Sequence, residues 1–329
     1  MTSLRALVSC LALAAACSEC HSTGNDTNTP NAARKGGEPM TNKVVLITVS
    51  GPGAPVLRKG PIPATVLIQN ASAGPVEVLL PYPNPNHLRF DCASGTRKHV
   101  ERQEIERTIP IALAPGQTYT ATYFLNRYLV FGAPGLTRVS YHLDVFTTPS
   151  GGEGGGEIVS DGELAIELIE GTDEVLKEEL SNYAAGLRSR DRKLKMEAAE
   201  ALAFLETPLA IEYQARMLSI DNLEVIGIEA LGRSSSPQAH KLIVGMLSHP
   251  DSTVVMAALS EIDRRHIDLP REKVYALLSS DNPNIRWTAV DWMAAHPDPR
   301  DRAAVSPLLG DPNAEVRERA KAYLGNLPP

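Results

Sequence analysis

Residues 308–325 read LLGDPNAEVRERAKAYLG, and residues 277–294 read LLSSDNPNIRWTAVDWMA, with the same order of apolar, polar and small positions. Both runs place a Leu pair before an Asp-containing breaker and a helix-forming segment after it. Through the C-terminal part of the chain, one apolar position recurs at steps of 29, 31, 31 and 31 residues, at Leu194, Leu223, Val254, Ile285 and Val316. Each is followed by a small residue four positions later and a large apolar residue eight positions later: Ala198, Gly227, Ala258, Ala289, Ala320, and Leu202, Leu231, Ile262, Met293, Leu324.

These positions lie on one face of a helix, because an α-helix has about 3.6 residues per turn. Two further ladders run in phase with the first, one of leucines and one of prolines: Leu187, Leu218, Leu247, Leu278, Leu309, and Pro208, Pro237, Pro270, Pro299, Pro328. The three ladders predict about five short antiparallel helix pairs over residues 171–329. We expect the pairs to stack as an α-solenoid, in which each pair buries its apolar face against its neighbours.

The run 308–325 resembles a HEAT-type repeat of the short, phycobilisome-lyase-like kind, and residues 277–289 resemble it again. The resemblance implies a HEAT-like solenoid for about half of the chain, in a family that contains scaffolds, lyases and hydroxylases. The family's hydroxylases bind iron through His-Glu dipeptides. None of the eight histidines here is followed by Glu. We therefore expect no di-iron centre.

The N-terminal residues are typical of an export signal. An apolar run from Ala6 to Ala16, too short to span a bilayer, leads to residues 13–17, which read LAAAC. This run resembles a bacterial lipobox, which implies a signal peptide at 1–16, lipidation of Cys17 and, from the polar composition that follows, a flexible tether at 17–41. We expect export to the periplasm or outer membrane, with a lipid anchor. Plain cleavage after Ala16, giving a secreted soluble protein, is the alternative.

Residues 17–21 read CSECH, which also matches the attachment motif of c-type haem. Haem needs a folded apolar pocket, whereas a polar, Pro-containing stretch follows the motif. We therefore expect no cofactor. After cleavage, Cys20 and Cys92 could pair in an oxidising compartment, and the sequence leaves this pairing open.

Residues 42–170 change to a strand-like pattern. Short β-branched runs at 43–49, 64–69, 76–80 and 137–145 are separated by segments rich in Gly, Pro and Asn. The pattern predicts some eight strands in an antiparallel β-sandwich. Residues 113–135 resemble the last strands of immunoglobulin-like domains in bacterial export proteins and protease inhibitors, which implies an immunoglobulin-like sandwich. The predicted fold class is thus multidomain, all-β followed by all-α.

The sequence contains no nucleophile-elbow, zinc-protease or phosphate-loop motif. His99 with Glu101, and His142 with Asp144, lie two residues apart on predicted strands, so each pair could face one metal ion. A solvated strand face is the simpler interpretation, because the two pairs would also have to meet in space. We therefore expect no metal and no catalytic residues.

The second helix of each predicted pair has an apolar position where water is expected. Counted from the ladder residue, positions two and six point away from the packed side, and the HEAT resemblance places that side on the concave face of the solenoid. Position two reads Met196, Val225, Met256, Trp287 and Glu318, and position six reads Glu200, Glu229, Ser260, Asp291 and Ala322.

Met and Trp are enriched at the cores of protein interfaces. We therefore predict that Met196, Val225, Met256 and Trp287 contact a protein partner, and that Glu229 and Asp291 attract a basic or amphipathic segment of it. The alternative is that neighbouring helices crowd position two and bury it as core.

The net charge of −7 disfavours nucleic acid as a partner. The sequence thus predicts a non-catalytic, lipid-anchored cell-envelope protein that binds a protein partner through the concave face of its solenoid. Two alternatives remain: an enzyme of the HEAT-repeat lyase type, or a protease inhibitor that acts through sandwich loops. For the inhibitor, the Pro-rich residues 81–86 are the candidate loop.

Overall fold

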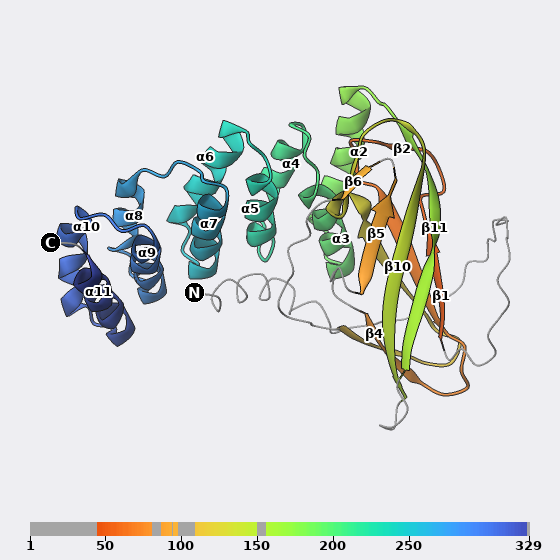
Figure 1. The fold of residues 1–329 in the computed structure, drawn as a ribbon, viewed down its shortest axis with the longest axis horizontal. Coiled ribbons are helices and arrows are strands. Elements are labelled where there is room, and N and C mark those ends of the chain that lie inside the picture. The colour runs from red at the N-terminus through yellow and green to blue at the C-terminus, as the bar shows by residue number, and fades with distance from the viewer. Residues whose placement is uncertain (1–44, 81–86, 94, 98–108, 150–155, 328–329) are drawn as a thin grey trace. The chain divides into compact units, whose positions relative to one another are not determined.

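The computed structural model describes residues 45–80, 87–93, 95–97, 109–149 and 156–327. Strands come first along the chain and helices follow, so a β part precedes an α part (Figure 1). The chain divides into two compact units between Gly171 and Thr172. Each unit has its own core of buried hydrophobic residues.

The β unit holds a three-stranded sheet in the order β1-β3-β8 and a β6-β9 pair. Its larger sheet has the order β2-β11-β10-β4-β7, with β5 also paired to β10. Adjacent strands are antiparallel except β2 and β11, which are parallel. The strands are β1 Val45–Ser50, β2 Val56–Leu57, β3 Pro63–Asn70, β4 Val76–Leu80, β5 Leu88–Cys92, β6 Gly95–Arg97, β7 Ile109–Leu113, β8 Thr118–Phe124, β9 Leu129–Phe131, β10 Gly135–Pro149 and β11 Gly156–Ile169, with a short 3-10 helix, η1, at Leu125–Arg127.

Strand alternation determines the core of the β unit. On β3, Val66 and Ile68 are buried while Leu67 between them is exposed, as expected for side chains that point to opposite faces. Inward residues of β3 and β10 belong to the same hydrophobic cluster, so the two larger sheets share one core. The strands predicted at 64–69, 76–80 and 137–145 are confirmed as β3, β4 and β10.

β10 is the central strand of the larger sheet. It pairs with β11 from Gly135 to Thr147 on one edge, and with β5 and then β4 on the other. In this register His142 lies opposite both Asp161 of β11 and Arg89 of β5. His142 and Asp144 share one face of β10, because successive side chains alternate. The register therefore brings polar residues of three strands together.

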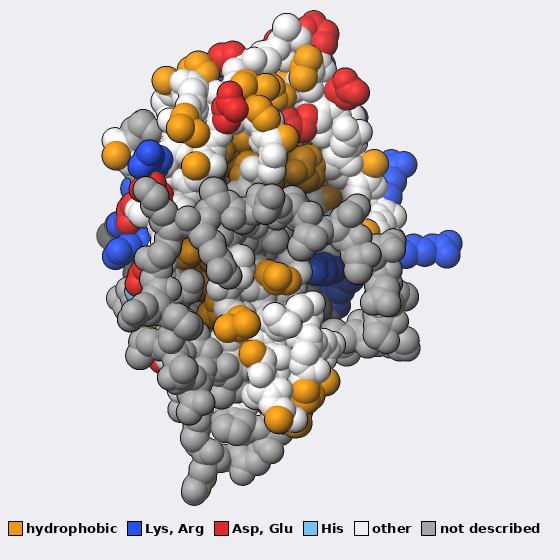
Figure 2. Space-filling model, turned by 90° about the vertical axis from the view of Figure 1, so that its right-hand side faces the viewer, with side chains coloured by type: hydrophobic (Ala, Val, Ile, Leu, Met, Phe, Trp, Pro, Cys, Tyr) orange, Lys and Arg blue, Asp and Glu red, His pale blue; other side chains and the backbone are white. Residues whose placement is uncertain are grey.

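Hydrophobic residues also occur on the surface of the β unit. The large ones exposed on its described strands are Leu46, Leu67, Val130, Leu136, Val159 and Ile169. In the view of Figure 2, hydrophobic side chains lie in small groups among uncharged, acidic and basic ones. Scattered hydrophobic residues of this kind are ordinary on a protein surface.

The described α unit consists of five successive helix pairs. Each pair is an even-numbered helix followed by an odd-numbered one, and 3-10 turns extend two of the first helices (Figure 1). The helices are α2 Asp173–Gly186, α3 Arg192–Ala203, α4 Ala210–Met217, α5 Glu224–Gly232, α6 Pro237–Gly245, η2 Met246–Ser248, α7 Ser252–Arg264, α8 Arg271–Leu277, α9 Pro283–Ala295, α10 Asp301–Val305, η3 Ser306–Gly310 and α11 Ala314–Asn326.

The polar breakers begin most of the second helices. Asp191, Asp251, Asn282 and Asn313 are the N-cap residues of α3, α7, α9 and α11, and each side chain accepts a backbone N–H of the first turn. α5 differs, because its N-cap is Leu223 and no side chain caps it. Asp221, which precedes α5 as the other polar breakers precede their helices, does not cap it.

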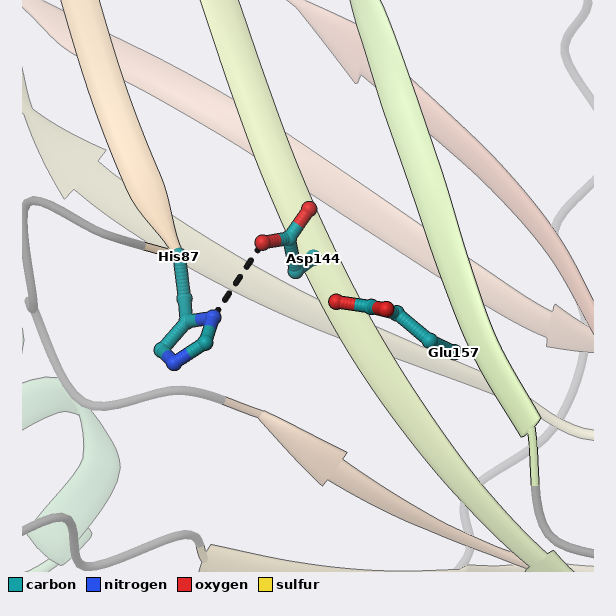
Figure 3. Close-up of side chains that lie close together, drawn as sticks. All are labelled: His87, Asp144 and Glu157. Atoms are coloured by element: carbon teal, nitrogen blue, oxygen red, sulfur yellow. Dashed lines mark hydrogen bonds and ion pairs between the residues drawn. The ribbon is translucent and has the colours of Figure 1, made fainter.

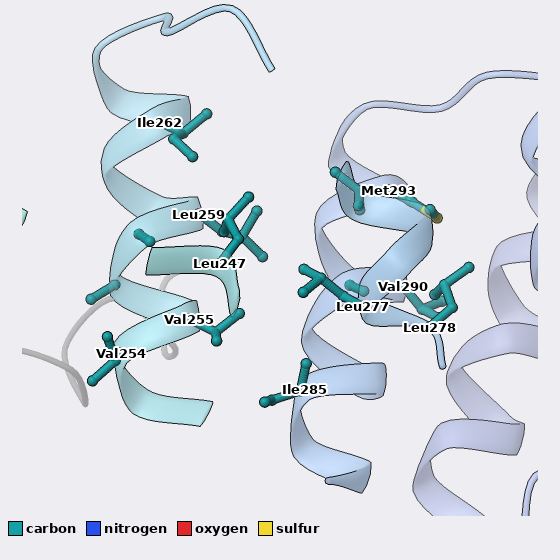
Figure 4. Packing of buried hydrophobic residues seen from close by; sticks show 14 of the residues in the cluster. Leu247, Val254, Val255, Leu259, Ile262, Leu277, Leu278, Ile285, Val290 and Met293 are labelled. Atoms are coloured by element: carbon teal, nitrogen blue, oxygen red, sulfur yellow. The ribbon is translucent and has the colours of Figure 1, made fainter. Parts of the chain in front are cut away.

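The predicted ladders form the core of the α unit. Ala258, Ala289, Leu231 and Met293 are fully buried, and Figure 4 shows ladder residues of α7 and α9 directed into the packed interior. The odd-numbered helices contact one another in chain order from α3 to α11. Each small residue at position four thus lies where a neighbouring element packs closely.

Two ladder residues depart from this pattern. Leu194 is 53% exposed and Leu309 is 49% exposed, although their counterparts in the middle pairs are buried or half-buried. Leu194 lies in the first described pair and Leu309 in the last. Within the described α unit, such end pairs have a neighbouring pair on one side only, so part of their ladder surface stays uncovered.

Candidate functional site

The four predicted partner residues occupy equivalent places on successive second helices, with Met196 on α3, Val225 on α5, Met256 on α7 and Trp287 on α9. We call these four residues the apolar ridge. Met196, Met256 and Trp287 are half-buried, whereas Val225 is buried at 8% exposure. Three of the four therefore keep part of a large apolar side chain at the surface.

Trp287 lies between the core and a charged pair. Its ring packs against the hydrophobic cluster of the α unit, and the Arg319 guanidinium carbon lies 5.9 Å from the ring centroid. Arg319 of α11 in turn makes an ion pair with Asp291 of α9, and both side chains are about one third exposed. The charge of Asp291 is thus already matched within the chain. Glu229, at the equivalent position of α5, is half-buried.

A buried ion pair joins α9, which carries Trp287, to the turn that precedes α11, which carries Arg319. The Arg286 Nε and Nη2 groups donate to the two carboxylate oxygens of Asp311 at 2.7 and 2.8 Å. Its Nη1 donates to the carbonyls of Ser280 and Asp281, which end the preceding turn. The hydrogen bonds from Arg286 lower the pKa of Asp311, which therefore stays ionised at neutral pH.

The pattern of the ladders does not predict this pair, although the sequence contains a signal for it. Arg317 follows Arg286 by one repeat, and its Nη1 donates to the carbonyls of Asp311 and Pro312 just as Arg286 does one repeat earlier. In the last two repeats an Arg directly follows the ladder residue and an Asp precedes the cap, and this recurrence could have predicted an inter-repeat bond.

A second buried carboxylate joins the last two helix pairs. Asp301, fully buried at the start of α10, accepts hydrogen bonds from Arg271, Tyr275 and Tyr323. Burial alone would raise the pKa of Asp301, but these hydrogen bonds outweigh it and lower the pKa. Burial, together with the bond to Asp301, raises the pKa of Tyr323 to about 12. All three donors serve packing, so we assign no chemistry to this cluster.

The His142–Asp144 pair of β10 lies in a larger polar group. His87, directly before β5, and Glu157, near the start of β11, each place one possible ligand atom within 4.8 Å of Asp144 and of each other. His142 Nδ1 lies 2.6 Å from Asp161 Oδ1, and this hydrogen bond raises the pKa of His142. The simple picture of a solvated strand face is therefore incomplete, because Asp144 is only 6% exposed.

Several residues singled out in the sequence lie outside the described chain: Cys17, Cys20, His99, Glu101 and the 81–86 loop. Cys92 lies at the end of β5 and is half-buried. None of the described helices has the length and hydropathy that a membrane crossing requires.

No family model matches the chain, and no curated protein matches it significantly in sequence. Similar solved structures include an engineered protein that is 20% identical, with a TM-score of 0.27 over 45% of this chain and 79% of that chain. AggA, the major subunit of aggregative adherence fimbriae type I from Escherichia coli, is 15% identical, with a TM-score of 0.24 over 40% of this chain and 98% of that one. Trypsin-activated alpha-2-macroglobulin from Escherichia coli is 12% identical, with a TM-score of 0.23 over 86% of this chain and 24% of its own. TM-scores this low establish no shared fold, so the proposals below rest on the chain's own residues.

Proposed function

We propose that this protein is a non-catalytic binding protein of the cell envelope, anchored by lipid at Cys17. In this proposal residues 171–329 form a HEAT-like α-solenoid, and residues 42–170 form an immunoglobulin-like β-sandwich between it and the tether. The solenoid binds a protein partner through the face that carries the apolar ridge.

The architecture of the α unit supports this proposal. Its odd-numbered helices pack one against the next, with a small buried residue at the same position of each: Ala198, Gly227, Ala258, Ala289 and Ala320. A stack of this kind presents equivalent positions of successive helices side by side along one surface. An extended protein segment can bind such a surface at several points.

The observation that carries the proposal is the half-buried state of Met196, Met256 and Trp287. The ladder residues two positions before Met256 and Trp287, Val254 and Ile285, are buried, whereas Leu194, two positions before Met196, is 53% exposed. Large apolar side chains left partly in water at the same place on three helices offer a partner apolar surface to cover. Val225 is the exception, since it belongs to the core cluster.

The partner's chemistry follows from the residues beside the ridge. Position six carries Glu200, Glu229 and Asp291, and none of the five residues at that position is basic. Arg319 holds Asp291 and lies over Trp287, so a partner that covers Trp287 also covers this ion pair. We therefore favour an amphipathic segment that places apolar side chains on the ridge and basic ones along position six.

Affinity capture with the mature chain from envelope extracts, followed by a direct binding measurement on the captured protein, tests the proposal. Trp287→Ala should weaken binding by about 2 kcal/mol or more, roughly 30-fold in Kd, as expected for an aromatic residue at an interface centre. Leu309→Ala is the matched control, because it also removes an exposed large hydrophobic residue from the α unit but lies off the ridge. The control should bind like the wild type.

Folding is followed in parallel by helical circular dichroism and thermal melting. A Trp287→Ala protein that melts normally and still binds the same partner with unchanged affinity rules out the ridge as the binding site. A loss of binding that merely follows loss of structure has the same consequence, because the ridge would then be core.

A further inference from the structure

A second candidate site lies in the β unit, on one face of the β5-β10-β11 ribbon. The register places Asp144 of β10 beside His87 at the start of β5, whose carbonyl accepts the Asp144 N–H at 2.8 Å. It also places Glu157 of β11 opposite Phe146, on the face shared by His142 and Asp144. Three residues distant in sequence thus meet near one point (Figure 3).

The three side chains place one potential ligand atom each close to the other two. His87 Nδ1 lies 3.1 Å from Asp144 Oδ2, and one carboxylate oxygen of Glu157 completes a set whose members are all within 4.8 Å of one another. Two ligand atoms bound to one tetrahedral ion at about 2.0–2.2 Å would be roughly 3.3 Å apart. The His87–Asp144 separation already fits, and a rotation of the exposed Glu157 side chain can close the remainder.

The second observation concerns Asp144 itself. Its side chain is only 8% exposed, and its Oδ1 atom is buried without a hydrogen bond. His142 Nε2 lies 3.0 Å from this oxygen and forms an ion pair with it when the imidazole is protonated. Desolvation of a carboxylate oxygen is costly unless a hydrogen-bond donor or a cation compensates it. A nearly buried carboxylate that faces an imidazole and a second carboxylate is a donor set that a metal ion can bind.

We propose that His87, Asp144 and Glu157 bind one divalent transition-metal ion, with Zn²⁺ as the best match. An imidazole nitrogen suits Zn²⁺ better than Ca²⁺ or Mg²⁺, and carboxylate oxygens complete many zinc sites. His142, held at Nδ1 by Asp161, faces the other oxygen of Asp144 and restricts how that carboxylate can turn. This proposal departs from the sequence-based expectation of no metal.

The ion would cross-link β5, β10 and β11. Asp144 is in the middle of β10, whereas His87 immediately precedes β5 and Glu157 is the second residue of β11. Binding would therefore join the beginnings of two strands to the central strand of the larger sheet. Because an ion that binds only the folded state stabilises it, added Zn²⁺ should raise the melting temperature of the β unit.

The experiment is a competition for Zn²⁺ against a chromogenic chelator, with the full chain carrying Cys17→Ser and Cys20→Ser. These two changes remove thiols of the N-terminal segment that could bind the ion independently. This reference protein should bind one Zn²⁺ per chain. His87→Ala and Glu157→Gln should each weaken binding at least tenfold, the lower bound for losing even an outer-shell partner of a zinc site. Ca²⁺ should bind at least tenfold more weakly than Zn²⁺.

Two matched controls keep the test specific. Glu163→Gln removes a carboxylate from the same face of β11, six residues along, and His266→Asn removes an exposed histidine from the α unit while tolerating its φ of 52°. Both should bind like the reference protein. The His87 and Glu157 side chains are not buried, so their replacement leaves the core intact.

Three outcomes would refute the site. The reference protein could bind no Zn²⁺, His87→Ala and Glu157→Gln could bind Zn²⁺ like the controls, or Ca²⁺ could bind as tightly as Zn²⁺.

Discussion

Removal of one partner of the buried Arg286–Asp311 pair should strongly destabilise the α unit. Arg286→Met leaves the Asp311 carboxylate, whose side chain is only 3% exposed, without the guanidinium that bonds both of its oxygens. It also removes the Nη1 bonds to the carbonyls of Ser280 and Asp281. Leaving one charge of a buried pair uncompensated costs about 3–5 kcal/mol.

The magnitude can be measured by thermal unfolding followed through the helical circular-dichroism signal. At about 2–4 °C per kcal/mol for a unit of this size, Arg286→Met should lower Tm by roughly 10 °C. Arg216→Met is the comparison, because Arg216 pairs with Glu212 one helical turn away and both side chains are largely exposed. Its cost should stay below about 1 kcal/mol.

A double-mutant cycle separates the pair from its surroundings. Arg286→Met combined with Asp311→Leu replaces both charges by apolar groups, so it should cost less than the sum of the single changes by about 2 kcal/mol or more. If Arg286→Met costs no more than Arg216→Met, or if the two single costs simply add, the pair does not hold the repeats together. Burial of the Asp311 carboxylate would then not make the loss of Arg286 costly.

Three further predictions address the core, the buried carboxylate and the anchor. Ala258→Leu and Ala289→Leu should each overpack a fully buried position and cost about 1–3 kcal/mol in chemical unfolding, whereas Ala322→Leu on the exposed side of α11 should change little. Because folding lowers the pKa of Asp301, the contribution of its carboxylate to the stability of the folded state is complete above the ordinary pKa of 3.8 and is lost as the pH falls through the folded pKa. Asp301→Asn should therefore be less stable than the wild type at neutral pH, and the difference in stability should shrink in acid. Cys17→Ser should move the protein from the membrane to the soluble fraction, and an unmodified N-terminus in the native protein, found by mass spectrometry, would contradict lipidation.

The α unit was predictable because local and repeated signals agree. Periodic apolar residues, Asp or Asn caps and prolines all mark the same helix boundaries, and the repeat supplies five copies of the evidence. Asp191 and Asn313, polar residues directly before two of the predicted helices, are the N-caps of α3 and α11. Prediction failed where position within the array matters. Leu194 matches the ladder in type and spacing, but it is exposed because the end pair lacks a second neighbour within the described α unit.

For the apolar ridge, helical periodicity predicts the exposure of some residues but not of all. Helical periodicity predicts that position two points away from the packed side, and this accounts for the partly exposed Met256 and Trp287. It cannot predict Val225, which is buried on the shorter helix α5. Nor can it predict that Arg319 crosses to Trp287 and pairs with Asp291, because that contact depends on how α9 and α11 pack.

The His87–Asp144–Glu157 group was beyond prediction for a related reason. The sequence shows His142 and Asp144 two apart on one strand, and alternation correctly places them on one face. The other two residues join Asp144 only through strand register. A shift of one residue in either β5 or β11 would move His87 or Glu157 to the opposite face. The group therefore depends on two independent strand registers, and the local sequence pattern around each residue specifies neither of them. The Zn²⁺ experiment therefore also tests whether an ion contributes to the pairing of β5 and β11 with β10.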